Sequence, residues 1–592
     1  MLFVMSIKQL ESEAHLYFNQ GNVKLAIETH NKILTLDPNN LASLTNLSYL
    51  YFHSQHYDLA LLISNRAILL YPDNVDILLN HANALRECGE LDRSIVCLEK
   101  ATRLNPNFAA AWNGLSLGYI DKGRASDAIS SAEKSIKSDS NFIHAYSNLA
   151  IILQLIGETS RADRLFQRAL LIDKSELLLH HNYLMNQQYL PNLSSLQLKS
   201  SAIEYGDEVI KRSGQSAKYS KRLPDLNNRQ INIGFISADF RCHPVGFFFQ
   251  SVIASFDSSK IKSFLYLNQQ IDDDLTKELT QSADNSLNIL KMTDQEVITR
   301  ISDDNIHILF DLSGHSAGNR LSIFAKKAAP IQVSWLGYFA STGLPTIDFV
   351  FLGENQINTA SQSYFSENIY LLKGTQFCYQ PPSYAPKPSS PPCLQNNYIT
   401  FGSFNNLAKL NCDVIELWSK ILLQVPNSRL LLKWKVFADV NIQNKVISLF
   451  ALNGIENHRI ELRSASAHKD MLDEYADIDI ALDPFPFSGA LTTCEALWMG
   501  VPVITYAQER PVSRQTLGIL AAIDMNNFSA KTPKQYLELA CHLSHNTNKI
   551  IELRQSLRTK MEKSELMDGK AMANKIEKAC MDIYMQAHYK NN

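Results

Sequence analysis

The sequence predicts an α + α/β protein, with an N-terminal α-helical solenoid followed by two doubly wound halves that each hold a parallel sheet. Three observations carry this prediction. Residue types recur every 34 positions in the first third of the chain. Short apolar runs alternate with helical segments in the remainder. A proline-rich stretch, QPPSYAPKPSSPPC at 380–393, divides that remainder into two parts.

Composition excludes several classes of protein. The 592 residues are 45% apolar and 19% charged, as in globular proteins with a large core. A net charge of -3 supplies no basic field for nucleic acid or an anionic membrane. Nine scattered cysteines without a CxxC pair favour reduced thiols over disulfides or a zinc site. The N-terminal MLFVM segment lacks the basic flank and length of a signal peptide. We therefore expect a cytoplasmic protein with no nucleic-acid or membrane partner.

The first element is the solenoid, predicted over residues 7–212. Three sets of positions share the 34-residue spacing: prolines at 38, 72 and 106, glycines at 21, 89, 123 and 157, and alanines at 26, 60, 128 and 162. This pattern resembles the tetratricopeptide repeat, a pair of antiparallel helices per unit. The concave face of such a solenoid can hold an extended acceptor peptide. Repeats of this kind also serve as dimerisation surfaces, so a homodimer is a further expectation.

A polar linker is expected over residues 213–228, and a first α/β domain over residues 229–379. Three apolar runs predict its strands: Ile231 to Ile236, His307 to Leu312 and Ile331 to Leu336. The proline-rich bridge takes residues 380–397. A second α/β domain follows over residues 398–592, with strands in YITFGSF, SRLLLKW, RIELRS, DIDIALD and VPVITY and a helical tail from about Asn546. Two such halves imply a cleft, with ligands at the carboxyl ends of the strands.

An anion site is predicted in the stretch LDPFPFSGALTTCEALWMG at 482–500. A strand there leads through a turn of small residues into a helix whose first turn holds Thr492, Thr493 and Glu495. Free backbone N–H groups and the positive end of the helix dipole suit a phosphate. A carboxylate one turn further on can accept both hydroxyls of a ribose. The alternative is that these are ordinary helix-capping residues.

Three more clusters follow strands. The motif FGSFNNLAKLN brings Asn406 close to Lys409, a residue that can neutralise a diphosphate leaving group, although a solvated surface lysine is the alternative. SADFRCHPVG carries His243, and DLSGHSAGNRL carries His315, Asn319 and Arg320 in a glycine-containing ligand loop. A structural hydrogen-bonding role is the alternative for both histidines. The Asp-x-Asp of DIDIALD lies in a strand that reads as buried, so no metal is predicted.

These motifs, in this order behind tetratricopeptide repeats, are similar to the SPINDLY and O-GlcNAc transferase family. The resemblance covers nearly the whole chain. It implies a GT-B glycosyltransferase with two Rossmann-like domains that is metal-independent and inverting. Such an enzyme needs no cofactor and moves a sugar, usually from UDP-GlcNAc, to Ser or Thr of proteins. Related enzymes use GDP-fucose, or glucosylate Asn.

The resemblance also implies roles for individual residues. Lys409 contacts the diphosphate, Thr492 and Thr493 bind phosphate, Glu495 holds the ribose, and His243 faces the sugar and acceptor as a base or positioning group. Four differences from the animal enzymes concern the nucleotide: Asn406 replaces Gln, Ala490-Leu491-Thr492 replaces His-Thr-Thr, Met471 replaces a nucleoside-contacting His with His468 nearby, and Glu495 replaces Asp. The nucleotide and the sugar therefore stay open. A non-catalytic repeat scaffold is the rival from another class.

Overall fold

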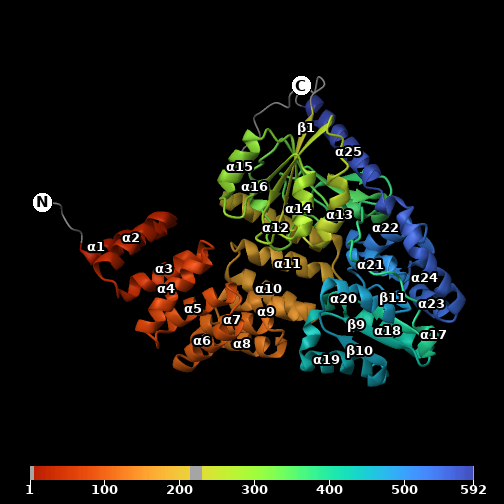
Figure 1. Cartoon of the computed structure of the whole chain (residues 1–592), viewed down its shortest axis with the longest axis horizontal. Helices are drawn as coiled ribbons and strands as arrows, with labels where there is room; N and C mark the ends of the chain where they lie inside the picture. The colour runs from red at the N-terminus through yellow and green to blue at the C-terminus, as the bar shows by residue number, and fades with distance from the viewer. Residues whose placement is uncertain (1–5, 214–229, 591–592) are drawn as a thin grey trace. The chain divides into compact units, whose positions relative to one another are not determined.

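The computed structural model describes residues 6–213 and 230–590 (Figure 1). The MLFVM segment and all but the first residue of the expected linker lie outside the described residues. The chain divides into two compact units, residues 1–153 and 154–592.

The first unit consists of paired antiparallel helices, which confirms the predicted repeats. Its elements are α1 (Ile7–Asn19), α2 (Val23–Leu36), α3 (Leu41–His53), α4 (Tyr57–Leu70), α5 (Val75–Glu87), α6 (Leu91–Leu104), α7 (Ala109–Asp121), α8 (Ala125–Ser138) and most of α9 (Ile143–Leu155). Gly21, Gly89 and Gly123 end the first helix of a pair with φ of 73°, 83° and 74°, a conformation that glycine adopts without strain. Ala26 and Ala60 are fully buried where helices meet.

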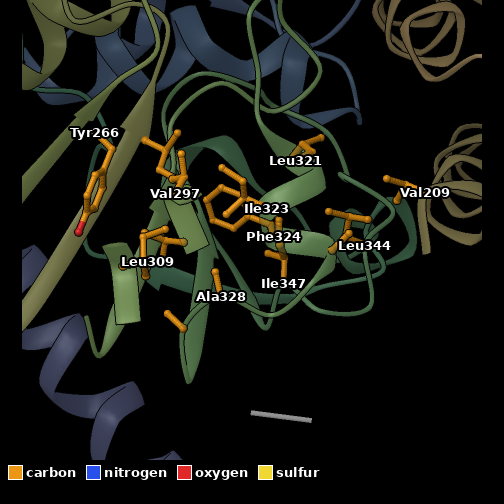
Figure 2. Packing of buried hydrophobic residues seen from close by; sticks show 14 of the residues in the cluster. Val209, Tyr266, Val297, Leu309, Leu321, Ile323, Phe324, Ala328, Leu344 and Ile347 are labelled. Carbon is orange, nitrogen blue, oxygen red and sulfur yellow. The ribbon is translucent and has the colours of Figure 1, made fainter. Parts of the chain in front are cut away.

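The second unit begins with the last solenoid helices, α10 (Thr159–Ile172), α11 (Leu177–Tyr189) and α12 (Ser195–Ser213). One hydrophobic cluster joins Leu184 of α11 and Val209 of α12 to Phe324 and Leu344 of the first α/β half. Figure 2 shows Val209 beside Leu344 at the edge of this cluster. The compact unit therefore begins at residue 154, well before the expected linker, because the end of the solenoid shares a core with the α/β part.

The first α/β half holds a seven-stranded sheet in the order β3-β2-β1-β4-β5-β6-β7, with every neighbouring pair parallel. Its strands are β1 (Ile231–Ser237), β2 (Ile261–Leu267), β3 (Asn285–Asn288), β4 (Ile308–Asp311), β5 (Ile331–Ser334), β6 (Phe349–Gly353) and β7 (Asn368–Leu372). Its helices are α13 (Pro244–Ile253), α14 (Asp274–Ser282), α15 (Asp294–Asp303) and α16 (Leu321–Ala325). Sequence patterns predicted three of these strands, β1, β4 and β5. Strands β2 and β6 were missed although they are longer than β4 and β5 and mostly buried, and β3 and β7 lie at the sheet edges.

The second half holds a six-stranded sheet in the order β10-β9-β8-β11-β12-β13, again parallel between neighbours. Its strands are β8 (Thr400–Ser403), β9 (Arg429–Lys433), β10 (Ile460–Arg463), β11 (Ile480–Leu482), β12 (Val503–Tyr506) and β13 (Ser529–Ala530). Its helices are α18 (Cys412–Gln424), α19 (Val440–Ala451), α20 (His468–Asp473), α21 (Leu491–Trp498), α22 (Gln515–Ala522), α23 (Pro533–Ser544) and α24 (Thr547–Glu562). All five strands predicted here are present.

Two segments connect the halves. The proline-rich bridge runs without regular structure to the single turn α17 (Cys393–Asn396). The last helix, α25 (Gly569–Lys590), returns to the first half (Figure 1). There Glu577 accepts the N–H of Asp257 at 2.7 Å, and Asp582 accepts the hydroxyl of Tyr370 at 2.7 Å. The last helix of the predicted tail thus packs on the first half, whereas α24 packs against α21 and α23 of the second half. Among the described residues, no helix is both long enough and apolar enough to cross a membrane.

Candidate nucleotide-sugar site

Lys409 is held at the carboxyl end of strand β8. It closes a 3₁₀ turn, η3 (Leu407–Lys409), for which Asn406 is the N-cap and accepts the N–H of Ala408 at 3.0 Å. The Lys409 Nζ donates to Asn405 Oδ1 and to the Ser488 carbonyl, both at 2.9 Å. Both acceptors are neutral oxygens, so the ammonium is oriented while its charge stays available to an anion.

Burial lowers the pKa of Lys409 to about 8, and the nearby Asp483 carboxylate opposes this shift. The side chain is therefore mostly charged at neutral pH but is poorly solvated. A lysine in this state gains more from a bound anion than a hydrated surface lysine does, because less water is displaced when the anion arrives.

The start of helix α21 lies next to Lys409. Thr492 Oγ1 donates to Asn405 Oδ1 at 3.2 Å, so one amide oxygen links the lysine and the helix. Ala490 is the N-cap residue, and no side chain caps this helix end. Its first N–H groups therefore remain suited to an anion. Thr493 is 2% exposed and bonds Thr516 Oγ1 at 2.9 Å, so its hydroxyl faces helix α22 in this structure.

A buried carboxylate, Asp483, shapes the turn between the lysine and the helix. It follows strand β11 directly and is 1% exposed. Its Oδ1 accepts the N–H of Gly489 at 2.6 Å, and its Oδ2 accepts the Thr505 hydroxyl at 2.7 Å. The sequence analysis did not select Asp483, although its place at the carboxyl end of a strand was a usable signal.

Glu495 lies one turn into α21 and is 2% exposed. Its Oε1 is 2.7 Å from His468 Nε2, and His468 Nδ1 is 2.7 Å from the hydroxyl of Tyr384 in the bridge. Burial raises the pKa of Glu495, and the His468 contact opposes that shift. The structure thus brings together two residues predicted for the nucleotide, Glu495 and His468, and adds Tyr384, which sequence reasoning missed.

His243 caps helix α13 in the first half. Its Nδ1 accepts the N–H of Val245 at 3.4 Å and lies 3.6 Å from Asp239 Oδ1. Burial lowers the pKa of His243, and Asp239 opposes this. Accepting at Nδ1 places the proton of the neutral ring on Nε2. In this state the ring presents a donor at Nε2.

The three residues of the first-half loop have structural partners. His315 is 2% exposed; its Nε2 bonds the Thr342 carbonyl at 3.0 Å and its Nδ1 lies 2.8 Å from His181 Nδ1 on α11. Arg320 forms an ion pair with Asp294 at 2.6 Å. Asn319 donates to the Ser316 carbonyl at 2.9 Å. The His181 contact joins this loop to solenoid helix α11, and the other contacts hold it within the first half, so His315 does not face an open cleft.

The Asp-x-Asp pair that precedes strand β11 also has partners. Asp479 accepts the N–H groups of Thr400 at 2.8 Å and Cys393 at 3.0 Å. Asp477 pairs with Arg463 at 2.6 Å.

The cavity beside Lys409 is small. Its volume is about 20 Å³, and its walls include Asn405, Asn406 and Pro484. Such a space holds about one water molecule, whereas nucleotide-sized ligands need several hundred Å³. This cavity by itself is therefore too small for a nucleotide.

Comparisons with known proteins agree with this architecture. The model of glycosyl transferase family 41 matches residues 207–380 and 391–576, well over half of the chain. Tetratricopeptide repeat models match residues 12–40, 75–108 and 145–178.

Two plant relatives carry the name probable UDP-N-acetylglucosamine–peptide N-acetylglucosaminyltransferase SPINDLY. The protein from Hordeum vulgare is 32% identical over 408 residues, which cover 68% of this chain and 43% of the relative. The protein from Oryza sativa subsp. japonica is 32% identical over 424 residues, which cover 71% of this chain and 46% of the relative. The chain thus spans less than half the length of these relatives.

A solved structure also matches. The O-GlcNAc transferase of Thermobaculum terrenum, determined as a lysine-to-methionine mutant, superposes with a TM-score of 0.80 at 26% identity. The match covers 88% of this chain and 98% of that one.

Proposed function

Because the chain belongs to glycosyltransferase family 41, we propose that it is a protein glycosyltransferase that moves a sugar from a nucleotide diphosphate onto Ser or Thr hydroxyls. One observation carries this proposal: the partly desolvated ammonium of Lys409 lies beside the uncapped start of helix α21. A fixed cation and a helix N-terminus together stabilise the diphosphate charge that develops as the sugar leaves.

The proposed reaction is a single displacement. The bond between the sugar C1 and the diphosphate oxygen breaks, and its electron pair leaves with the diphosphate. The acceptor oxygen bonds to C1 from the opposite side, and its proton passes to a base, to water or to a phosphate oxygen. Lys409 and the dipole of α21 neutralise the leaving group in place of a metal ion. His243 positions the sugar and acceptor.

The nucleoside end is assigned to Glu495 and His468, and the phosphate to Thr492, Thr493 and Lys409. Asn406 supports the lysine as N-cap of its turn. Rotation of the Thr493 hydroxyl away from Thr516 would add a donor to the phosphate. In the first half, Asn319, Arg320 and His315 support the acceptor side of the cleft by holding its loop.

UDP-GlcNAc is the proposed donor, since the plant relatives carry that substrate in their names. Transfer of fucose from GDP-fucose and glucosylation of Asn are the alternatives within the family. A non-catalytic repeat scaffold is the alternative outside it. Lys409 speaks against the scaffold, because a purely structural domain does not need a desolvated lysine at a helix start.

The solenoid is proposed to hold protein acceptors, and the repeats to support a homodimer. A cytoplasmic location is part of the proposal, because all nine cysteines are free thiols and reduced thiols fit that compartment.

A thermal-shift panel tests the donor. The purified full chain is heated with UDP, GDP, UDP-GlcNAc, UDP-glucose or GDP-fucose, beside Lys409→Ala and Glu495→Ala. A ligand at 100 times its Kd adds about 2.7 kcal/mol to the free energy of unfolding. We expect stabilisation by uridine nucleotides that is reduced in both variants, and transfer of labelled GlcNAc to protein. Absence of any shift would support the scaffold.

A further inference from the structure

We infer that Tyr384 of the proline-rich bridge is a positioning residue of the donor site, which acts through His468 on Glu495. The inference rests on the proposed function and deepens it, because it assigns the bridge a part in recognising the nucleoside of the donor.

The hydrogen bonds that join Tyr384, His468 and Glu495 all donate toward the Glu495 carboxylate. Glu495 accepts hydrogen bonds when ionised, so His468 donates its Nε2 proton across the 2.7 Å contact. The neutral imidazole then has a lone pair on Nδ1, which accepts the Tyr384 hydroxyl at 2.7 Å. The Tyr384 proton therefore selects the His468 tautomer that stabilises an ionised Glu495.

Contacts on both sides of Tyr384 set its position. Before it, the N–H of Gln380 donates to the Phe247 carbonyl of α13 at 3.0 Å. After it, the Pro386 carbonyl accepts Arg558 of α24 at 2.5 Å. Prolines in this bridge restrict the backbone between those anchors. The bridge thus holds the tyrosine between the two halves. It therefore positions a side chain as well as connecting the two halves.

His468 also contacts two aromatic rings from outside the second half. The Phe247 ring centroid lies 5.6 Å from that of His468, and the Tyr384 centroid lies 5.8 Å from it at 87°. Rotation of His468 would break its contacts with a first-half residue and a bridge residue. Its orientation, and that of the Glu495 carboxylate, depends on both.

This arrangement leaves Glu495 able to bind a ribose. An ionised carboxylate has about four acceptor positions, and His468 uses one of them. Because His468 holds the Glu495 side chain in one rotamer, its other carboxylate oxygen can accept ribose hydroxyls without a further loss of side-chain entropy. Removal of the Tyr384 hydroxyl should weaken nucleoside binding and leave the phosphate end, around Lys409, unchanged.

The test is isothermal titration of the full chain with UDP, GDP and inorganic pyrophosphate. Tyr384 is 40% exposed, so Tyr384→Phe is expected to fold. We expect it to weaken nucleoside diphosphate binding about threefold to tenfold, with pyrophosphate binding unchanged. In transfer assays the KM for the donor should rise by the same factor while kcat changes less than about twofold.

Tyr370→Phe is the matched control, because Tyr370, in the edge strand β7 of the first half, also donates to an acceptor at 2.7 Å, the Asp582 carboxylate of α25. If Lys409→Ala weakens binding and Tyr384→Phe does not, this inference fails and the proposed function stands. Equal loss of nucleotide and pyrophosphate affinity in Tyr384→Phe also overturns it, since that indicates general disruption. Wild-type protein that binds neither UDP nor GDP overturns the proposed function and this inference with it.

Discussion

The Nζ atom of Lys409 lies 4.6 Å from the centre of the Phe487 ring. Tyr189, the last residue of solenoid helix α11, stacks on the same ring with 5.1 Å between centroids and 21° between planes. Arg510 adds bonds to the carbonyls of Leu190 at 2.6 Å and Gln187 at 3.0 Å. The end of the solenoid therefore packs against the loop that contacts Lys409. Phe487 in this loop connects α11 to the proposed catalytic lysine.

Lys409→Ala should lower the rate of transfer by about 10²–10³, the usual effect of removing a preorganised electrostatic group. Steady-state assays with labelled donor measure it, and circular dichroism should show unchanged helix content. Lys420→Ala, which removes a surface ion pair with Glu416 on α18, is the control. Near wild-type turnover of Lys409→Ala would contradict the assignment.

The pH dependence follows from the pKa of Lys409, which burial lowers to about 8. In the proposed site the charged form binds the diphosphate, and this form is lost as pH rises through that value. The kcat/KM for the donor should therefore fall above about pH 8. Bound diphosphate raises the pKa of a neighbouring ammonium, so the fall in kcat should lie at higher pH. A kcat/KM that stays level to about pH 9.5 would argue against this role.

Phe487→Leu should lower kcat/KM by about threefold to thirtyfold, the range expected for a desolvated cation–π contact. Because the ring favours the charged form of Lys409, its loss should also move the alkaline fall in kcat/KM to lower pH. Tyr398→Leu is the control. It removes a similar contact elsewhere in the second half, where Arg429 Cζ lies 4.4 Å from the centre of the Tyr398 ring. The control should keep the wild-type pH profile, and identical profiles in all three proteins would refute the prediction.

Gly157→Ala should impair both stability and transfer. Gly157 has φ of 83°, and an added Cβ would lie 3.0 Å from the Leu407 carbonyl, in the turn that carries Lys409. Gly454 has φ of 81° with open space around it, so Gly454→Ala reports the backbone strain alone. We expect Gly454→Ala to lose about 1 kcal/mol of stability in thermal or urea unfolding and Gly157→Ala to lose more, and only Gly157→Ala to lose activity beyond its fraction unfolded.

The buried pair His181 and His315 should make stability depend on pH. Burial lowers the pKa of His181 to about 4 and that of His315 well below its ordinary value of 6.5. The unfolded chain takes up these protons near pH 6.5 and the folded chain does not, so stability falls as pH decreases below that value. Each such proton lowers the free energy of unfolding by up to about 1.4 kcal/mol for each pH unit below that value.

His315→Gln should flatten this dependence between about pH 6.5 and 5, as measured by urea unfolding at each pH. His458→Gln, at an exposed histidine beside Glu456, should leave the slope as it is in the wild type. A slope that is equal in all three proteins would show that the buried pair does not titrate differently on unfolding.

Much of the fold could be predicted from the sequence because its signals are local. The 34-residue period marked the helix pairs, and continuous apolar runs marked strands buried on both faces, such as β4 and β12. Strand β3 was missed because it lies at a sheet edge and carries exposed polar side chains, which weakens the apolar pattern. Strands β2, β6 and β7 were missed although their residues are largely apolar. The tail was predicted as helix, but its amphipathic pattern could not say which half it covers.

The residues of the candidate site could likewise be predicted only in part from local sequence. Lys409, Thr492 and Glu495 could be selected from motifs at the carboxyl ends of strands, because a parallel sheet brings those ends together. The motif around His315 had the same local appearance, yet the structure packs it against α11, since a histidine that is 134 positions away supplies its partner. Local sequence does not report such a partner.

The sequence by itself determined the repeats, the two parallel sheets and the motif residues of the proposed donor site, because periodicity and strand-end motifs are formed by neighbouring positions. Only the tertiary structure decided which side chains complete that site. Tyr384 and His468 are 84 positions apart, and His468 and Glu495 are 27 apart. Such contacts form when tertiary packing fixes how helices, strands and the bridge lie relative to one another. The spacing of residues along the chain does not specify that arrangement.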